Sequence, residues 1–482
     1  TTTTTTTKAT TTTTTTRDEK IIFCHYKNHR DSNPISRAPL LLASFSDTNE
    51  RDVVSDENSA SQHGKISFEN LNEKRVLVVG GSGRVGGSVV CQLLQHGANV
   101  IVGGQSHESF LKSQQRWKIL FPNISKQIDD VEFLSMDREK ADTVTIHDTN
   151  LNLIIHTAGP FQGKVGTPNG VIQAAIDAQI PYLDVCDDYC TSSAAKTKYS
   201  QRAIQNNVPC ILSTGCWPGV SSLMAKQLIH TTLQEYPKQT PQNLNLNFSF
   251  FTAGSGGAGS TLLVATFLIL AEQALTIVNN RRKEVPAMKT YSTVNFGKIV
   301  GNRDVAHLNL LETASIHDIL QIGNITTLFG TAPPFWNTLL GIMAQLPPTL
   351  LANEPIMEKL ALFSLPIVRI VDYFAGATNA MRCDLTSNTD PNIHQMALYA
   401  HSNLEPCVGE CVIAFACAIL AADNTVTPGV WLPEEAIESG NDAAAVLSLA
   451  SIGAHTVEYI NHDHQKNYNP ASFDSIWGPK QN

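Results

Sequence analysis

The segment "RVLVVGGSGRVG" at residues 75–86 decides the fold class of this chain of 482 residues. Its apolar start predicts a buried strand, and apolar residues at helical spacing in residues 85–94 predict a helix directly after the turn. Gly81, Gly83 and Gly86 therefore form a G-x-G-x-x-G pattern between a strand and a helix. This context predicts a dinucleotide-binding turn.

Each glycine of this motif has a separate physical role. The first permits a tight turn, the second lets a pyrophosphate approach the backbone, and the third lets the helix pack on the strand. Phosphate oxygens then face the free N–H groups at the positive end of the helix. The alternative is a glycine-rich turn that holds no ligand. The predicted cofactor loop consists of Gly80, Gly81, Ser82, Gly83, Arg84, Val85 and Gly86.

The end of the second predicted strand favours NADP over NAD. An acidic residue there would bind both ribose hydroxyls of NAD and repel the extra phosphate of NADP. Residues 103–106 read "GGQS" and contain no acid. We expect Arg84 together with Ser106 to meet a 2′-phosphate and Gln105 to contribute to the cofactor site, with NAD left as the other possible cofactor. The alternative for Arg84 is a solvated surface position.

Two further segments are expected beside the dinucleotide. Asp137 ends the third predicted strand and is placed to meet the adenine edge. Ala158, Gly159 and Pro160 follow the fourth predicted strand and are expected to run close to the ribose on the nicotinamide side. Both segments lie where parallel strands end, which is the edge of an open α/β sheet that binds ligands.

Alternating strands and helices predict an α/β fold with a Rossmann doubly wound parallel sheet at residues 73–238. The rhythm then changes, and residues 239–403 predict a second, α+β domain with a mixed or antiparallel sheet. Residues 404–482 are expected to form C-terminal helices and a tail, and whether they return to the Rossmann domain is left open. Residues 1–72 are hydroxyl-rich and predict a disordered extension. This extension is consistent with a plastid-targeting segment or with a cytosolic leader.

Composition restricts the partners. The formal net charge of −9 argues against nucleic-acid binding. The ten cysteines show no C-x-x-C pair and no metal-ligand spacing, so we expect reduced, mostly buried thiols and no metal site. No transmembrane segment is expected, because the apolar run at 261–271 is too short and ends at Glu272. That run predicts a buried helix or a membrane-surface contact.

The glycine turn is followed in order by "HTAGPFQ" (156–162), "YLDVCDDY" (182–189) and "STGCWPGVSSLMA" (213–225). With these motifs the sequence resembles the saccharopine dehydrogenase superfamily, most closely its stand-alone oxidoreductases of plants and algae. The resemblance spans residues 74–436. It implies a Rossmann domain that binds NAD(P), an inserted domain for substrate and homodimer contacts, and hydride transfer to or from carbon bound to nitrogen.

One motif departs from the family. Where saccharopine dehydrogenases have D-P-G, this chain has Trp217, Pro218 and Gly219, which we predict to line the substrate pocket. An indole cannot carry a proton, and it suits a flatter or more apolar substrate than a polar amino-acid adduct. Saccharopine itself is therefore disfavoured as the substrate.

Candidate acid–base residues cluster at the end of the fifth predicted strand. Asp187, Asp188 and Tyr189 lie at the ligand-binding edge, and adjacent carboxylates raise the pKa of one another. The alternative is that one carboxylate caps the next helix while the others are solvated. His156, inside a predicted strand, is interpreted as a core residue.

These patterns predict an NAD(P)-dependent oxidoreductase acting on a small, moderately apolar molecule at the cleft between two domains. The alternative is a non-catalytic nucleotide-binding scaffold or sensor. Its apolar helix at 261–271 would contact a partner or a lipid surface.

Overall fold

The computed structural model describes residues 66–141, 150–162, 170–253, 260–422 and 425–461. Most of the predicted N-terminal extension, 1–72, lies outside these residues. Its last part is ordered, because Ile66 is buried and the short 3-10 helix η1 (Phe68–Leu71) buries Leu71 in the core. Residues 66–72, which lie before the predicted boundary at residue 73, are therefore part of the folded structure.

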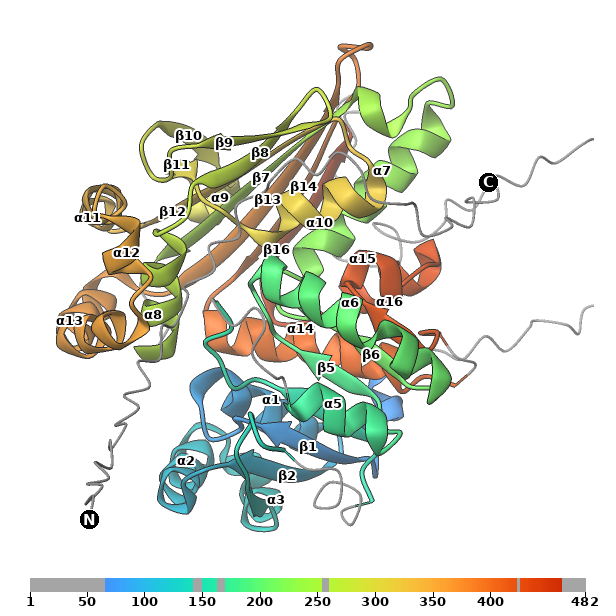
Figure 1. Cartoon of the computed structure of the whole chain (residues 1–482), viewed down its shortest axis with the longest axis vertical. Coiled ribbons are helices and arrows are strands. Elements are labelled where there is room, and N and C mark those ends of the chain that lie inside the picture. The colour runs from blue at the N-terminus through green and yellow to red at the C-terminus, as the bar shows by residue number, and fades with distance from the viewer. Residues whose placement is uncertain (1–65, 142–149, 163–169, 254–259, 423–424, 462–482) are drawn as a thin grey trace, which may run out of the picture. The chain divides into compact units, whose positions relative to one another are not determined.

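A seven-stranded parallel sheet confirms the predicted Rossmann fold (Figure 1). Its strand order is β15-β6-β5-β4-β1-β2-β3, and each neighbouring pair is parallel. The order reverses between β1 and β4, which creates the point where such sheets bind ligands. The strands are β1 (Arg75–Val79), β2 (Asn99–Gly104), β3 (Glu132–Ser135), β4 (Leu153–His156), β5 (Tyr182–Asp184), β6 (Pro209–Ile211) and β15 (Gly429–Trp431).

The apolar run of β1 explains why helices cover both faces of this sheet. Val76 and Val78 join one hydrophobic cluster, while Leu77 and Val79 join another, because successive strand residues point to opposite faces. The first face is covered by α1 (Arg84–Gln95) and α2 (His107–Leu120), the second by α5 (Gly170–Asp177) and α6 (Tyr189–Gln205). The short helices η2 (Pro122–Ile124) and α3 (Ser125–Asp129) follow α2.

The second domain contains a nine-stranded mixed sheet, as predicted for an α+β domain. Its main order is β10-β11-β12-β7-β13-β14-β16, with β8 and β9 attached through β12. The strands are β7 (Leu244–Ala253), β8 (Ala274–Val278), β9 (Arg281–Val285), β10 (Tyr291–Asn295), β11 (Asn302–His307), β12 (Asn324–Ala332), β13 (Thr378–Ser387), β14 (His394–His401) and β16 (Ala454–Asn461).

β7 alternates buried and more exposed residues only in its first half. The strand lies inside the sheet, where it pairs parallel with β12 and antiparallel with β13. Phe248, Phe250 and Phe251 are all buried, so both faces of its second half are covered. The polar residues of the first half produced the alternation, because Asn245 and Asn247 lie near the sheet end.

The remaining helices complete the second domain and its connections. They are α7 (Val220–Glu235), η3 (Pro241–Asn243), α8 (Ser260–Ile269), α9 (Gly297–Val300), α10 (Leu311–Leu320), α11 (Pro334–Met343), α12 (Pro348–Leu351), α13 (Glu354–Ala375), α14 (Leu404–Ile419), α15 (Pro433–Ala436) and α16 (Gly440–Leu449). Among the described residues, no helix is both long and apolar enough to cross a membrane.

The C-terminal segment contributes to both sheets. β15 pairs with β6 of the parallel sheet, and β16 pairs with β14 of the mixed sheet. α14, which precedes both strands in the sequence, packs closely on α1. A Cβ atom on Gly409 of α14 would lie 2.3 Å from the Ser88 hydroxyl of α1, so this helix pair needs glycine at its contact point. Residues after 404 therefore cover the helix that follows the glycine turn.

Candidate functional site

The glycine turn is compact and closely packed. Gly80 has a φ of +82°, donates from its N–H to Gly103 O at 2.8 Å, and accepts at its carbonyl from Gly83 N–H at 2.9 Å. A Cβ atom on Gly86 would lie 2.3 Å from the Gly80 carbonyl oxygen and 2.5 Å from Thr157 Oγ1. The third glycine of the motif therefore permits α1 to pack on the strand ends.

Gly83 is less crowded than Gly86. It is exposed, and a Cβ atom there would meet the Gly80 carbonyl oxygen alone, at 3.1 Å. As the N-cap residue of α1 it has no side chain to satisfy the first helical N–H groups, and no acidic residue follows in the first turn. The positive end of α1 is thus uncapped beside an accessible backbone, which is the chemistry of a phosphate site.

Arg84 forms an ion pair with a residue that is distant in the sequence. Its Nη1 donates to Glu405 Oε1 of α14 at 3.0 Å. Burial, followed by the positive charge of Arg84, lowers the pKa of Arg116 in α2, so two guanidinium groups lie near the single carboxylate of Glu405. Ser113, one turn before Arg116, donates from its hydroxyl to Ser82 O at 2.7 Å and ties α2 to the glycine turn.

Arg116 is not among the residues that the sequence patterns predict for the site. Its position in the helix after the second strand, on the side of the cofactor loop, is the sequence feature that could have identified it.

The other predicted adenosine-side residues are held by local turns. Ser106 caps α2 by accepting from Ser109 N–H at 3.1 Å, and Gln105 is exposed beside it. Asp137 accepts from Glu139 N–H at 3.0 Å through Oδ1 and is half-buried. These side chains follow β2 and β3, so they lie along the carboxyl edge of the sheet.

The segment Ala158–Pro160 packs directly on the glycine turn. A Cβ atom on Gly80 would lie 2.8 Å from Ala158 Cα, so backbone meets backbone here. Arg138, which follows Asp137, donates from its guanidinium to the Ala158 carbonyl and holds this segment from the β3 side. Sequence reasoning also missed Arg138.

His156 belongs to a buried hydrogen-bond chain. Its Nδ1 lies 3.0 Å from the Tyr182 hydroxyl, which donates to Asp184 Oδ2 at 3.1 Å. Burial is the main cause that lowers the pKa of His156 to about 3 and raises the pKa of Asp184 to about 6. Asp184 Oδ1 accepts from Ser213 N–H at 2.8 Å and from Cys186 N–H at 3.1 Å, so this carboxyl fixes the backbone around β5.

Asp187 is the predicted acid whose position suits proton transfer. It is half-buried beyond the end of β5, and burial is the main cause that raises its pKa to about 6. The Gln162 side chain, from the loop after β4, donates to it. The carboxyl therefore lies beside the segment that contains Ala158–Pro160.

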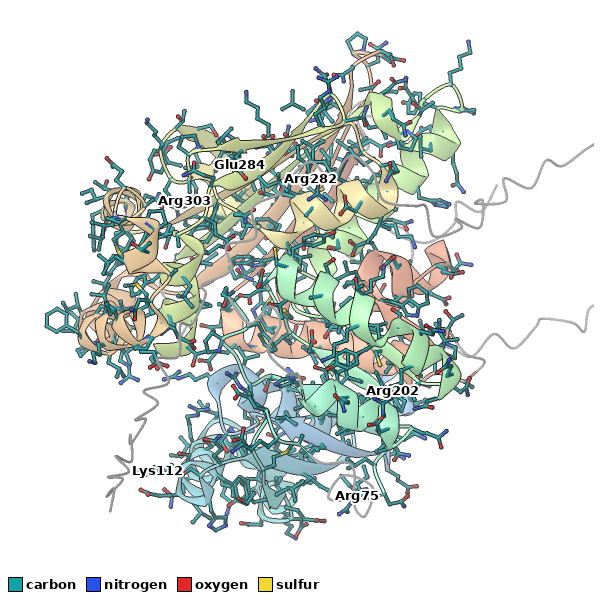
Figure 2. All side chains as sticks on the ribbon, in the orientation of Figure 1. Arg75, Lys112, Arg202, Arg282, Glu284 and Arg303 are labelled. Atoms are coloured by element: carbon teal, nitrogen blue, oxygen red, sulfur yellow. The ribbon has the colours of Figure 1, made fainter. Side chains whose placement is uncertain are left out.

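Asp188 and Tyr189 have other partners. Asp188 is the N-cap of α6, where it accepts from Cys190 N–H at 3.1 Å and from the Thr191 hydroxyl at 2.6 Å. The Tyr189 hydroxyl donates to Asp318 of α10, and burial followed by this charge raises the pKa of the phenol. Asp318 also binds Arg282 of β9 at 2.6 Å, a residue that Figure 2 shows on the second domain.

Trp217 packs against the second sheet. Its indole Nε1 donates to Asn379 Oδ1 of β13 at 2.9 Å, and its ring stacks on Phe250 of β7 with centroids 5.1 Å apart. The indole remains partly exposed, while Pro218 and Gly219 are buried at the start of α7. Trp217 therefore links the loop after β6 to the second domain.

Comparison with solved structures shows the fold. The apo saccharopine dehydrogenase (L-Glu forming) of Saccharomyces cerevisiae matches with a TM-score of 0.51 at 13% identity, covering 80% of this chain and 100% of the yeast chain. The fold is that of saccharopine dehydrogenase. No family model and no curated protein sequence matches the chain.

Two weaker likenesses accompany the saccharopine dehydrogenase match. A meso-dapdh mutant of Clostridium tetani E88 with DAP has a TM-score of 0.38 at 12% identity, covering 77% of this chain and 95% of the other. A short chain dehydrogenase of Shigella flexneri 2a complexed with NADP has a TM-score of 0.24 at 15% identity, covering 30% of this chain and 79% of the other. The particular closeness to plant and algal members stays a prediction.

Replacing Asp188 tests its role as the cap of α6. Asp188→Ala removes the acceptor for the first N–H groups of α6 and should lower the free energy of unfolding by about 0.5–2 kcal/mol. Asp188→Asn keeps an acceptor, so it should lower the free energy of unfolding by only a few tenths of a kcal/mol. Urea unfolding of both variants measures the difference. Equal stability of the alanine variant and the wild type would show that the cap is unimportant.

Proposed function

We propose that this chain is an NADP-preferring oxidoreductase of a small-molecule substrate. The observation that supports the proposal is the uncapped first turn of α1 at the same sheet edge as Asp187. A nicotinamide cofactor bound at this edge supplies or accepts a hydride at its ring. The chain's own residues have to hold the dinucleotide, orient the substrate and move one proton.

The glycine turn fits the pyrophosphate of a dinucleotide. The backbone N–H groups at the start of α1 point out of the helix, and Gly83 leaves room for the phosphate oxygens to approach. Ser82 Oγ supports the same assignment, because it is buried and has no hydrogen-bond partner among the described residues. A phosphate oxygen accepting from Ser82 would satisfy it.

The two arginines near this turn support a 2′-phosphate. Arg84 and Arg116 repel each other, and one carboxylate, Glu405, partly balances them. A phosphate dianion between the guanidinium groups would remove this repulsion. Residues 103–106 offer no acid that would oppose it.

Asp187 is the proposed proton donor. A hydride delivered to a C=O or C=N carbon leaves charge on the oxygen or nitrogen, which then needs a proton. With a pKa of about 6, Asp187 retains a protonated fraction near neutral pH. Gln162 fixes the carboxyl from one side, and Trp217 with Pro218 and Gly219 is the proposed substrate-pocket wall. The indole's engagement with Asn379 gives this wall a fixed apolar face and disfavours saccharopine as the substrate.

Substituting Gly83 tests dinucleotide binding. Gly83→Val places methyl groups where the pyrophosphate has to approach, and its Cβ atom would lie 3.1 Å from the Gly80 carbonyl oxygen, so the turn has to give by only a few tenths of an ångström. Wild-type protein with NADP at a hundred times its dissociation constant should gain about 2.7 kcal/mol of stability, seen as a raised thermal midpoint. Gly83→Val should keep its ligand-free midpoint and lose the shift. No shift of the wild type with NADP, NADPH, NAD or NADH would refute the proposed function.

Arg84 tests the cofactor preference. Arg84→Ala should weaken NADP binding about tenfold or more, because a charge-assisted contact to phosphate is lost, and should leave NAD binding nearly unchanged. Titration calorimetry with both dinucleotides measures the ratio. Lys112→Ala, an exposed cation of α2 paired with Glu108, is the matched control. Unchanged NADP affinity in Arg84→Ala, or tighter binding of NAD than of NADP by the wild type, would contradict the preference.

The pH profile tests Asp187. For reduction the acid must be protonated, so kcat/KM with NADPH should fall as pH rises above about 6, up to tenfold per pH unit. Oxidation uses the carboxylate and should show the opposite slope. Asp187→Asn should lose turnover while it still binds NADPH, and Asp188→Asn is the control that keeps turnover. Ketones, enones and imines are the substrates to screen. Full turnover in Asp187→Asn would exclude Asp187 as the donor.

Assembly and location stay predictions. The family resemblance supports a homodimer through the second domain, which analytical ultracentrifugation measures. The hydroxyl-rich residues 1–16 support a plastid location, with the cytosol as the alternative. Fluorescence microscopy of the tagged full-length protein distinguishes the two locations.

A second candidate function is a scaffold that contacts a lipid surface. The helix expected to do so, α8, buries Val264, Ala265, Phe267 and Leu268 and packs on α13, so less of its apolar surface is available than the sequence indicates. Exposed apolar side chains lie instead on α11 and α13, namely Phe335, Ile342, Leu362, Phe363 and Ile370. Such a face is unusual for a solvated surface.

Vesicle binding tests this second function. The double variant Phe363→Glu, Ile370→Glu should lose co-sedimentation with phosphatidylcholine vesicles, because charges oppose insertion. Ile119→Glu, at an exposed apolar residue of α2, is the control that should leave co-sedimentation unchanged. A wild type that stays in the supernatant would exclude a lipid contact.

A further inference from the structure

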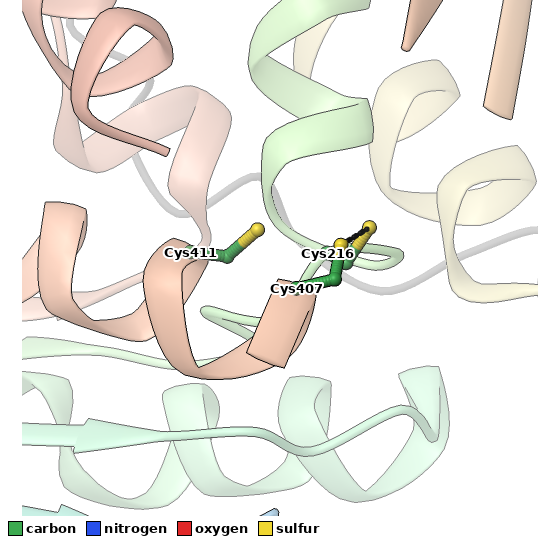
Figure 3. Close-up of side chains that lie close together, drawn as sticks. All are labelled: Cys216, Cys407 and Cys411. Carbon is green, nitrogen blue, oxygen red and sulfur yellow. Dashed lines mark hydrogen bonds between the residues drawn. The ribbon is translucent and has the colours of Figure 1, made fainter. Parts of the chain in front are cut away.

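Three buried cysteine thiols converge beneath the loop that carries Trp217. Cys216 comes from that loop, while Cys407 and Cys411 lie one helical turn apart on α14 (Figure 3). Their three sulfur atoms all lie within 4.8 Å of one another. Cys407 Sγ and Cys216 Sγ are 3.2 Å apart, and neither thiol is in a disulfide.

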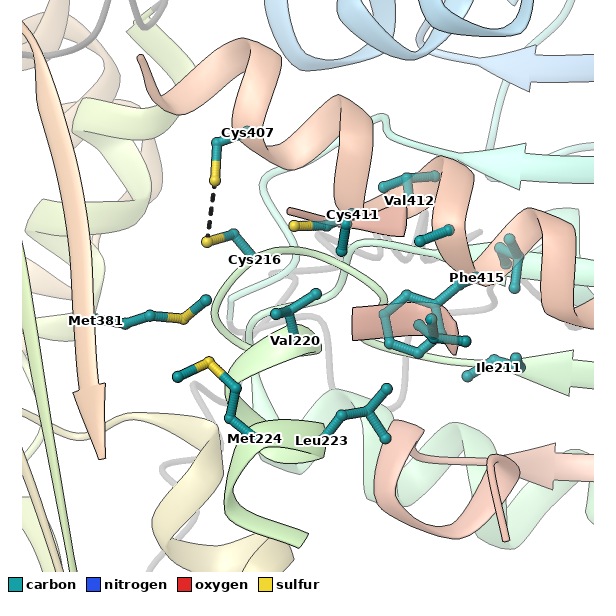
Figure 4. Packing of buried hydrophobic residues seen from close by; sticks show 14 of the residues in the cluster. Ile211, Cys216, Val220, Leu223, Met224, Met381, Cys407, Cys411, Val412 and Phe415 are labelled. Carbon is teal, nitrogen blue, oxygen red and sulfur yellow. Dashed lines mark hydrogen bonds between the residues drawn. The ribbon is translucent and has the colours of Figure 1, made fainter. Parts of the chain in front are cut away.

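The thiol cluster, Cys216, Cys407 and Cys411, is closed off from solvent. All three residues are at most 1% exposed. Figure 4 shows the apolar packing around them, including Met224, Met381, Val220 and Phe415. Cysteine often fills such space as a small apolar residue. Simple packing, however, does not require hydrogen-bond donors directed at the sulfur atoms, and this cluster has them.

Asn379 directs its amide N–H groups at the cluster. Its Nδ2 lies 3.3 Å from Cys216 Sγ and 3.4 Å from Cys407 Sγ. The orientation is fixed, because the Trp217 indole can only donate and therefore requires Asn379 Oδ1 as its acceptor. Asn379 is fully buried, so its amide has to find acceptors inside the protein. The sulfur atoms are those acceptors.

A second polar group contacts the same sulfur. The Tyr399 hydroxyl lies 3.4 Å from Cys407 Sγ and donates to Ala450 O at 2.9 Å. His401, on the same strand as Tyr399, lies 3.6 Å from Glu410 of α14. The sulfur atoms thus lie among oriented polar groups inside an otherwise apolar core. The Asn379 amide is the group that donates to the sulfur atoms, whereas the Tyr399 hydroxyl, whose single hydrogen goes to Ala450, can only accept from the Cys407 thiol. A donor placed as this amide is orients thiolate ligands of a metal.

The sulfur spacing suits a small thiophilic cation. With metal–sulfur bonds of about 2.3 Å, ligand sulfurs are about 3.8 Å apart in tetrahedral geometry and about 4.0 Å apart in trigonal geometry. The observed spacing, from 3.2 Å to at most 4.8 Å, brackets both values. Among the described residues, no fourth histidine, cysteine or carboxylate joins the group.

We propose that Cys216, Cys407 and Cys411 form a binding site for a thiophilic d10 cation, with Cu⁺ preferred over Zn²⁺. Soft thiolates select Cu⁺ and Zn²⁺ among biological metals, and structural Zn²⁺ takes four ligands where this site offers three. Binding replaces each S–H bond with a metal–sulfur bond and releases the proton to solvent, so nothing is oxidised. The bound cation would join the loop after β6 to the helix that covers α1.

Metal stoichiometry of the purified full chain tests the proposal. Under anaerobic conditions with a thiol-free reductant, Cu⁺ delivered from a chelator of known affinity should bind at one equivalent per chain, measured by mass spectrometry. It should raise the thermal midpoint, and its affinity should rise with pH because thiol protons are released. Zn²⁺ in a parallel titration should bind more weakly; tighter Zn²⁺ binding would overturn the stated preference.

Matched variants identify the site. Cys407→Ser and Cys411→Ala should each lose the bound Cu⁺. If Cys407→Ser fails to fold, Cys411→Ala alone tests the site. Cys417→Ser, another buried thiol of α14, should keep the bound Cu⁺. Any one of three results overturns the proposal: the wild type binds no Cu⁺, Cys417→Ser loses the bound Cu⁺ as the cluster variants do, or both cluster variants retain it.

Discussion

The close approach of α1 to the ends of β1 and β4 is the constraint on which the site depends. Gly86 has no room for a side chain against the Gly80 carbonyl and Thr157, so α1 must begin directly at the sheet edge. Its positive end is thereby aimed along the edge where β4 and β5 finish. The position of a bound phosphate, and with it the rest of a dinucleotide, follows from this one contact.

The C-terminal segment stabilises this arrangement from outside. α14 packs on α1 through Gly409, brings Glu405 to Arg84, and carries two of the three clustered thiols. Trp217 connects the same region to the second sheet through Asn379. Residues that are hundreds of positions apart therefore determine the geometry of the proposed cofactor turn.

Local patterns predicted the parts of the fold that local forces determine. The glycine motif, the buried run of β1 and the strand–helix rhythm depend on neighbours in sequence, and the parallel sheet confirms them. The central place of β7 and the pairing of β15 depend on distant strands. Asp188 caps α6, which is the alternative that the sequence left open for a carboxylate of this cluster. Cys216 and Cys407 are 191 residues apart, so spacing could not reveal their contact.

A structure of the complex with NADPH tests the central claim most directly. The account predicts the pyrophosphate against the N–H groups of Arg84, Val85 and Gly86, with Ser82 Oγ donating to it. It also predicts the nicotinamide beside Ala158–Pro160, facing the carboxyl of Asp187. A dinucleotide bound away from the first turn of α1, or a nicotinamide out of reach of Asp187, would contradict it.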